Sequence, residues 1–302
     1  MTDYRALLAR LAVPRLAGTA PAEQVRDALK RELAARGFVV MEQRFTGRSL
    51  LHRLARVPLP GVNLIAVRPR ARVATWLVAH YDSKGQPLSM AARLVAGSLA
   101  AVGMAELLGL ALRALLGTVR PGLLDALVGG AGAAGAALLA LNRVTDRSPG
   151  AVDNAAGVVT ALATVDALPA DAPVGVIFPD AEEYGLLGAR ALLRERANLL
   201  ADTTVVNFDG IDDRGRTIAL IHRAGTTVDR VARALQARRA RWLPVVVDGR
   251  VLAAAARECV TIMRGDWRTA RVVHTTGDTA ARLTLDGARR VAQAVAGALS
   301  PG

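Results

Sequence analysis

The 302-residue sequence is poor in cysteine, lysine and aromatic residues, and each shortage excludes a class of protein. Its single cysteine, Cys259, cannot form an internal disulfide, and we expect it to be a small buried apolar residue. Aromatic residues make up 3% of the chain, and Lys30 and Lys84 are its only lysines, so the net charge of +13 comes from scattered arginines. The sequence lacks the clustered basic and aromatic residues that favour nucleic-acid binding, and we expect no nucleic-acid partner.

The N-terminal segment lacks the uninterrupted apolar run of a secretory signal, because charged residues recur through residues 1–18. We therefore expect the main domain to remain in the cytoplasm. The apolar content of 52% and the mean hydropathy of +0.29 are nevertheless high for a soluble enzyme. The excess is concentrated in one part of the chain, residues 85–148.

Outside that part, strand-like apolar runs alternate with helix-like amphipathic segments. The expected strands are residues 38–45, 62–67, 75–79, 174–178, 203–208, 217–221, 260–263 and 270–273. The expected helices are residues 21–36, 155–168, 189–196, 228–237 and 283–299. This alternation predicts an α/β fold, a three-layer α/β/α sandwich with a mostly parallel central sheet.

Residues 85–148 predict an inserted apolar helical hairpin. Residues 94–116 contain only Glu106 and Arg113 as charges, and residues 123–141 contain only Asp125. Each run approaches the roughly 20 residues that span a bilayer. Small residues crowd the second run, which favours close packing of two helices in lipid.

We interpret this hairpin as a membrane contact through residues 88–143. Arginines flank it on the domain side, at Arg93, Arg143 and Arg147. By the positive-inside rule they predict a protein of the cytoplasmic membrane whose catalytic domain faces the cytoplasm. The alternative is a soluble cytoplasmic protein whose hairpin buries its apolar faces on the domain or on a second subunit. Three charges inside a membrane would be costly, which keeps that alternative open.

The stretch PDAEEYGLLGA, residues 179–189, lies where an expected strand leads into a helix. Its adjacent carboxylates, Glu182 and Glu183, point in different directions on such a turn. One can bind a metal ion while the other takes a proton from a water molecule beside it. An isolated acidic pair at a helix N-terminus is more often a solvated pair, so other residues must support the metal interpretation.

Other polar residues share the position of this pair. The residues that follow expected strands are His80, Glu183, Asp209 and His274. Parallel strands present their carboxyl ends at one edge of a sheet, so these side chains should meet there, and Asp153, just before a helix, can reach the same edge. Two imidazoles and three carboxylates suit two zinc-like ions if one carboxylate bridges them. His52 and His222 lack this context, and we expect them to be surface or packing residues.

Five motifs in order resemble those of the co-catalytic zinc aminopeptidases, the bacterial leucyl-aminopeptidase type of peptidase clan MH. They are HYDS (80–83), PGAVDNAAGV (149–158), DAEEYGLLGA (180–189), NFD (207–209) and HTTGDT (274–279). The resemblance implies a discontinuous zinc peptidase domain of residues 1–84 and 149–302. It also implies two zinc ions per chain and a peptide or aminoacyl substrate.

The resemblance also assigns roles to residues at matching positions. Asp153 would bridge the zinc ions, with His80 and Asp209 completing one site and Glu183 and His274 the other. Glu182 would be the general base, and Asp82 would fix the tautomer of His80 by a hydrogen bond. Tyr184 is a candidate for the pocket wall, although packing accounts for it equally well.

Two other functions stay open. Glutaminyl cyclase, a relative with one zinc and an HYDSK-like segment (here residues 80–84), would cyclise N-terminal glutamine. The stretch EEYGLLGA resembles the hydrolases better. A non-catalytic membrane scaffold on a peptidase fold would be missing at least one ligand or the base, and none is missing here.

Overall fold

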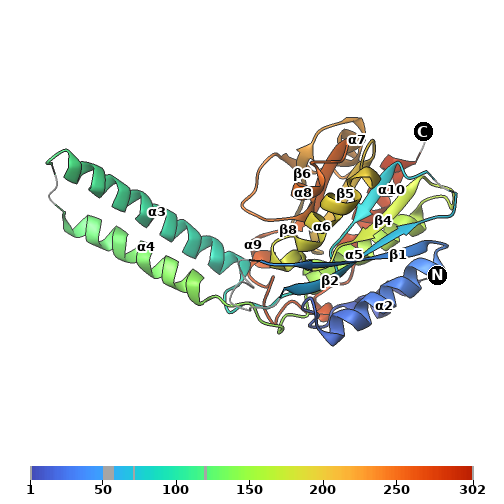
Figure 1. The fold of residues 1–302 in the computed structure, drawn as a ribbon, viewed down its shortest axis with the longest axis horizontal. Helices are drawn as coiled ribbons and strands as arrows, with labels where there is room; N and C mark the ends of the chain where they lie inside the picture. Colours follow the sequence, from blue (N-terminus) through green and yellow to red (C-terminus); the bar gives the residue numbers. More distant parts are fainter. Residues whose placement is uncertain (1, 50–57, 71, 119–120, 301–302) are drawn as a thin grey trace.

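The computed structural model describes residues 2–49, 58–70, 72–118 and 121–300. In these residues one eight-stranded sheet has the order β1-β2-β4-β3-β5-β8-β6-β7 (Figure 1). The strands are β1 (Val39–Gly47), β2 (Leu59–Val67), β3 (Thr75–Val78), β4 (Val174–Phe178), β5 (Thr204–Ile211), β6 (Arg216–Arg223), β7 (Arg238–Ala240) and β8 (Glu258–Gly265). The domain helices are α1 (Tyr4–Leu11), α2 (Ala20–Ala35), α5 (Ala156–Ala167), α6 (Leu187–Arg196), α7 (Thr226–Ala234), α8 (Asp248–Leu252), α9 (Trp267–Ala270) and α10 (Asp286–Leu299).

The centre of the sheet is parallel. Strands β4, β3, β5 and β8 run in one direction, and β6 pairs with β7 in parallel as well. Antiparallel pairs lie toward the edges, where β1 pairs with β2, β2 with β4, and β6 with β8. The mostly parallel sheet is therefore confirmed, and the carboxyl ends of its central strands lie at one edge.

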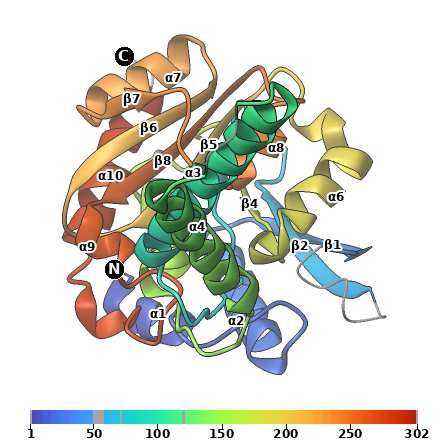
Figure 2. The ribbon, with the colours of Figure 1, turned by 90° about the vertical axis from the view of Figure 1, so that its left-hand side faces the viewer.

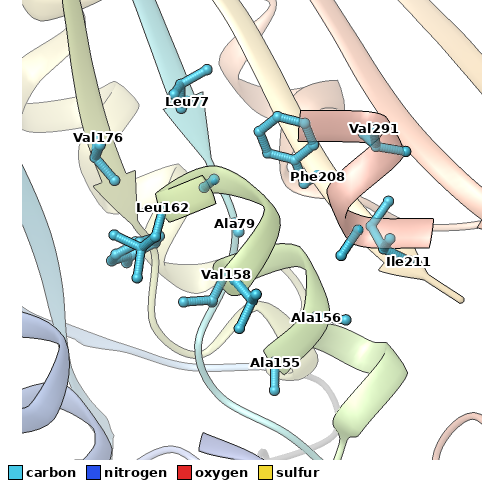
Figure 3. Packing of buried hydrophobic residues seen from close by; sticks show 14 of the residues in the cluster. Leu77, Ala79, Ala155, Ala156, Val158, Leu162, Val176, Phe208, Ile211 and Val291 are labelled. Atoms are coloured by element: carbon cyan, nitrogen blue, oxygen red, sulfur yellow. The ribbon is translucent and has the colours of Figure 1, made fainter. Parts of the chain in front are cut away.

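Helices cover both faces of the sheet. Alternate residues of β3 show why, since Leu77 belongs to one buried cluster and its neighbours Trp76 and Val78 to another. The first cluster joins the sheet to α1, α2, α5, α7 and α10, and Figure 3 shows part of it around α5. The second joins the sheet to α6 and α8. The three-layer sandwich is confirmed.

One expected strand is wrong. Residues 270–273 form no strand, and the chain there leaves the short helix α9 through turns. The carboxylate of Asp266 accepts hydrogen bonds from the backbone N–H groups of Arg268 and Thr269. This N-cap starts a helix at Trp267, and the helix outweighs the apolar run that suggested a strand.

The predicted apolar hairpin is present as α3 (Met90–Leu115) and α4 (Leu123–Leu141), which project from one side of the domain (Figures 1 and 2). Both helices are long and apolar enough to cross a membrane, and 11% of the residues in each apolar window are buried. At the base, Gly85 and Thr145 exchange two backbone hydrogen bonds of 2.7 and 2.8 Å. The domain is thus closed across the insertion.

The two hairpin helices pack closely through small residues. A Cβ atom added at Gly103 would lie 2.5 Å from Gly132 Cα, and one added at Gly135 would lie 2.5 Å from the Ala96 carbonyl oxygen. The glycines therefore allow backbone contact, as in close-packed membrane helices.

The charges near the far end of the hairpin pair with one another. Arg113 Nη2 lies 2.7 Å from Glu106 Oε1 and 2.9 Å from Asp125 Oδ1. Arg113 therefore pairs with one carboxylate from each helix of the hairpin.

The glycine contact predicts that Gly132→Leu separates α3 from α4, because the new side chain has no space beside Gly103. Spin labels on cysteines introduced at positions 107 and 127 would measure the separation, since the native Cys259 is buried. We expect a longer and broader distance distribution than in the parent. Gly130→Leu is the matched control, because nothing lies within 4 Å of a Cβ at Gly130. An unchanged distribution in Gly132→Leu would contradict the packing described here.

Candidate metal centre

The end of β3 carries His80 and Asp82, as the sequence predicted, and both are buried. His80 Nδ1 lies 3.4 Å from Asp82 Oδ1 and 3.2 Å from the Asp82 carbonyl oxygen. Both contacts fall on the Nδ1 side of the ring, which leaves Nε2 directed toward the other polar residues.

Asp82 also holds the Glu182–Glu183 turn. Its two carboxylate oxygens accept hydrogen bonds from the backbone N–H groups of Glu182 and Glu183, each at 3.1 Å. The turn follows β4 and places both glutamates in the interior, 6% and 3% exposed. One carboxylate therefore fixes the histidine and the acidic pair relative to each other.

Asp153 lies in a turn that precedes α5, and a second carboxylate fixes it. Asp278 accepts hydrogen bonds from the backbone N–H groups of Val152 and Asp153, at 2.8 and 3.2 Å. The next residue, Asn154, joined to Asp153 by a cis peptide bond, donates to the Phe208 carbonyl oxygen at 2.8 Å. That contact ties the turn to β5 beside Asp209.

Arg15 links two of these segments and was not found from the sequence. It is 1% exposed, and it donates to the Tyr81 carbonyl oxygen at 2.6 Å and to the Gly150 carbonyl oxygen at 3.0 Å. Its distance of more than 65 positions from either partner leaves no local signal in the sequence.

The predicted residues come together at this edge of the sheet. The carboxylate of Asp153 lies between two histidines, with Oδ1 3.1 Å from His80 Nε2 and Oδ2 2.9 Å from His274 Nε2. Glu183 Oε1 lies 3.0 Å from His274 Nε2, and Asp209 Oδ1 lies 3.9 Å from His80 Nε2. Asp209 lies inside β5 rather than just after it, and His274 follows turns rather than a strand.

These side chains form two groups, and within each group the ligand atoms lie within 4.8 Å of one another. One contains His80, Glu182 and Asp209, and the other contains Asp153, Glu183 and His274. Glu182 thus lies within ligand distance of the first group, although the sequence interpretation makes it the base. Both groups have the imidazole and carboxylate donors that zinc accepts.

Several of these atoms have no hydrogen-bond partner among the described residues. The buried atoms concerned are Asp153 Oδ1, Glu183 Oε1, Asp209 Oδ2 and His274 Nε2. Their mutual distances are short, but the contacts do not have hydrogen-bond geometry, so the lone pairs converge instead of being satisfied by one another. Buried polar atoms left in this way fit a shared cation.

Burial and charge divide the carboxylates into two kinds. Burial opposes ionisation of Asp153, but its contacts with His274 and His80 hold its pKa well below the usual value. Burial also opposes ionisation of Glu183, and the charges of His274 and Lys84 lower its pKa to about 2. Burial raises the pKa of Asp209 to about 8 and that of Glu182 well above its usual value. The centre therefore holds ionised and protonated carboxylates side by side.

Two cations also reach the His274 side of the centre. Lys84 Nζ lies 2.6 Å from Glu183 Oε2, and the Arg93 guanidinium, from the first turn of α3, contacts His274 Nδ1. The hairpin thus touches a predicted metal ligand.

The two remaining histidine predictions differ in outcome. His222 Nε2 lies 2.9 Å from Thr261 Oγ1, and His222 belongs to neither group of candidate ligands; burial lowers its pKa to about 4. His52 lies outside the residues that the structure describes.

Sequence reasoning missed Asp248, the first residue of α8. It is fully buried, and neither of its carboxylate oxygens has a hydrogen-bond partner among the described residues. Burial raises its pKa to about 7, and His80 is the main opposing charge. The signal was present, because Asp248 directly follows the apolar run Leu243–Val247.

A cavity of about 520 Å³ opens onto these residues. Asp153, Glu182, Glu183, Asp209 and His274 all line it, and most of the remaining wall is apolar. Tyr184 does not line this cavity; it packs in a buried cluster with Phe45 and Leu59. The arrangement joins a polar floor of candidate metal ligands to space for an organic substrate.

Comparison with known sequences decides the family. Residues 63–299 match the sequence family described as peptidase family M28. The chain belongs to this family. The predicted resemblance to zinc aminopeptidases is therefore confirmed, and no curated protein gives a match.

Solved structures of this fold include peptidases and cyclases. A zinc-dependent exopeptidase from Parabacteroides distasonis has a TM-score of 0.66 at 17% identity, over 98% of this chain and 96% of that one. A zinc aminopeptidase from Bacillus subtilis has a TM-score of 0.63 at 12% identity, over 98% of this chain and 93% of that one. A glutaminyl cyclase from Fimbriiglobus ruber has a TM-score of 0.62 at 17% identity, over 99% of this chain and 94% of that one. At these identities the likeness shows the fold.

The division of pKa values predicts that zinc loading of this M28 chain depends on pH. Both sides must lose protons before they bind zinc. The pKa of Asp209 is about 8, and although burial opposes it, the neighbouring carboxylates raise the pKa values of both His80 and His274. We expect the zinc content to rise from well below two ions per chain near pH 6 to about two near pH 8.5, measured by elemental analysis after dialysis.

His80→Ala is the control for this measurement, and it should bind at most about one zinc at the higher pH. Two zinc ions per chain at the lower pH, or two in His80→Ala, would contradict this assignment of the ligands.

Proposed function

We propose that this M28 chain is a di-zinc aminopeptidase that releases N-terminal residues from peptide or aminoacyl substrates. The observation that carries the proposal is the carboxylate of Asp153, whose two oxygens each face a different histidine at 3.1 and 2.9 Å. A carboxylate in that position suits a bridge between two ions. His80 and Asp209 would complete one site, and Glu183 and His274 the other.

Bound zinc would polarise the substrate carbonyl and lower the pKa of a water molecule. Glu182 takes the proton of the attacking water in this proposal. It lines the cavity, and although burial raises its pKa, the positive charge of bound zinc would favour the ionised carboxylate that can accept a proton. The same proton passes to the leaving amine, so Glu182 returns to its starting state.

Asp82 acts here through other residues. Its contact with His80 Nδ1 favours the tautomer whose Nε2 is free to bind a metal, and its hydrogen bonds to two backbone N–H groups aim the Glu182–Glu183 turn. These contacts support a positioning role, since Asp82 touches neither the cavity nor the proposed substrate.

Glutaminyl cyclisation is the second candidate, and Lys84 is the observation that favours it. Its ammonium occupies one oxygen of Glu183, and it completes the HYDSK segment of the cyclases. A single zinc per chain at every pH, with release of pyroglutamate from glutaminyl peptides, would establish this activity instead. A chain that binds no zinc would be a scaffold.

The base assignment predicts that Glu182→Gln binds zinc like the parent but hydrolyses leucyl substrates more slowly by about 10²–10⁴-fold, because the amide cannot accept the proton. Elemental analysis and release of leucine would be measured on the same preparation. Glu23→Gln, on the exposed side of α2, is the matched control and should behave as the parent. Residual activity close to the parent's in Glu182→Gln would remove this residue from the role of base.

We also propose that the α3–α4 hairpin anchors the protein in the cytoplasmic membrane, with the domain on the cytoplasmic side. Its exposed leucines, its close glycine packing and its paired charges support a lipid environment. The flanking arginines Arg143 and Arg147 support the orientation.

Anchoring predicts that the protein stays in the membrane fraction when cells are broken without detergent. A variant in which a short glycine–serine turn replaces residues 90–141 should move to the soluble fraction, because the Gly85–Thr145 pair still closes the domain. Full recovery of the parent protein in the soluble fraction would exclude the hairpin as an anchor.

A further inference from the structure

One wall of the catalytic cavity belongs to the hairpin. Met90 and Leu94 of α3 line the cavity, and their spacing of four residues puts them on one face of the helix. The same helix then continues outward with exposed apolar side chains such as Val102 and Leu108, 58% and 64% exposed. Apolar side chains of α3 therefore occur both in the cavity wall and on the exposed part of the hairpin.

The facing wall is also apolar, and part of it is exposed. The loop that joins β7 to α8 lines the cavity through residues 243–247. It lies on the side of the domain from which the hairpin projects (Figure 1). Trp242 and Val246 of this loop are 72% and 62% exposed. Large apolar side chains at a cavity mouth are unusual unless something apolar covers them.

A lipid bilayer fits these residues. Trp267, 54% exposed, borders a groove at the base of the hairpin, so tryptophans mark both the hairpin base and the cavity loop. Tryptophan is enriched at the boundary between lipid and water. Arg238 of β7 and Arg241, the first residue of the loop, are exposed and can attract anionic headgroups.

We propose that the cavity opens at the membrane surface and that the substrate is an aminoacyl amide with an apolar tail. The tail lies between α3 and the β7–α8 loop and reaches the bilayer, while the scissile bond lies at the metal centre. This inference rests on the proposed aminopeptidase function. An aminopeptidase leaves only one residue before the scissile bond, so the tail belongs to the leaving amine.

The reaction is an ordinary hydrolysis. The water oxygen bonds to the carbonyl carbon, the carbon–nitrogen bond breaks, and the proton held by Glu182 goes to the amine that carries the tail. The amino acid leaves toward water and the tailed amine stays at the bilayer.

The test compares matched substrates on the full zinc-loaded chain in vesicles of phosphatidylcholine and phosphatidylglycerol. Leucine ethylamide, leucine dodecylamide and a leucyl peptide with an apolar C-terminal segment all release leucine. We expect kcat/KM for at least one tailed substrate to exceed that for the ethylamide by about tenfold or more, because the tail leaves water. The better tail tells whether an alkyl chain or an apolar peptide is preferred.

Leu94→Gln separates recognition by the protein from partitioning into the vesicle. It should lower the ratio of tailed to ethylamide kcat/KM by about tenfold, because a polar side chain then faces the tail. Leu108→Gln, on the same helix but away from the cavity, is the control and should keep the parent ratio.

The outcomes distinguish the two proposals. Hydrolysis of all substrates without preference, or a ratio that Leu94→Gln leaves unchanged, overturns access from the membrane while the aminopeptidase function stands. No release of leucine from any substrate by the zinc-loaded chain overturns the aminopeptidase function itself.

Discussion

The architecture of this site depends on placing many carboxylates in one buried volume. Asp82, Asp153, Glu182, Glu183, Asp209 and Asp248 are all 9% exposed or less. Unpaired buried charge is costly, so each group must be protonated, hydrogen-bonded or paired with a cation. The protein uses all three means: raised pKa values at Glu182, Asp209 and Asp248, backbone N–H groups for Asp82, and cationic partners for Asp153 and Glu183. Among the described residues, the carboxylate oxygens left without a hydrogen-bond partner include those of Asp153, Glu183 and Asp209, which belong to the two candidate ligand groups, and both oxygens of Asp248, which belongs to neither.

The surrounding fold can be understood as support for this arrangement. Parallel strands bring His80 and Asp209 to one edge of the sheet, and the turns that carry Asp153 and Glu183 are each held by a carboxylate from elsewhere in the chain. Asp278 and Asp82 thus have the same task at two turns. Both are buried and both accept two neighbouring backbone N–H groups, which fixes a turn more firmly than a single contact would.

The sequence was informative where the physical signal is local. Apolar runs followed by polar residues predicted the central strands and the residues at their ends, and the length and composition of residues 85–148 predicted the hairpin. The short elements β7 and α8 were missed, since three and five residues carry little periodicity. Because α8 was missed, its first residue, Asp248, was missed as well. The capped helix α9 replaced an expected strand. Arg15, Lys84 and Arg93 were missed as partners because each contact joins distant segments, which no pattern in one sequence reveals.

The paired backbone of Gly85 and Thr145 has a consequence for how the chain is assembled. Fifty-nine residues lie between these two positions by their numbering, yet the backbones of Gly85 and Thr145 pair as they would around a short turn. The entropy of closing the junction grows only slowly with the length of such a loop, so the hairpin adds little to the cost of folding the domain. The domain can then fold around an insertion of a different length, provided that the base of α3 keeps its contacts with His274 and with the cavity.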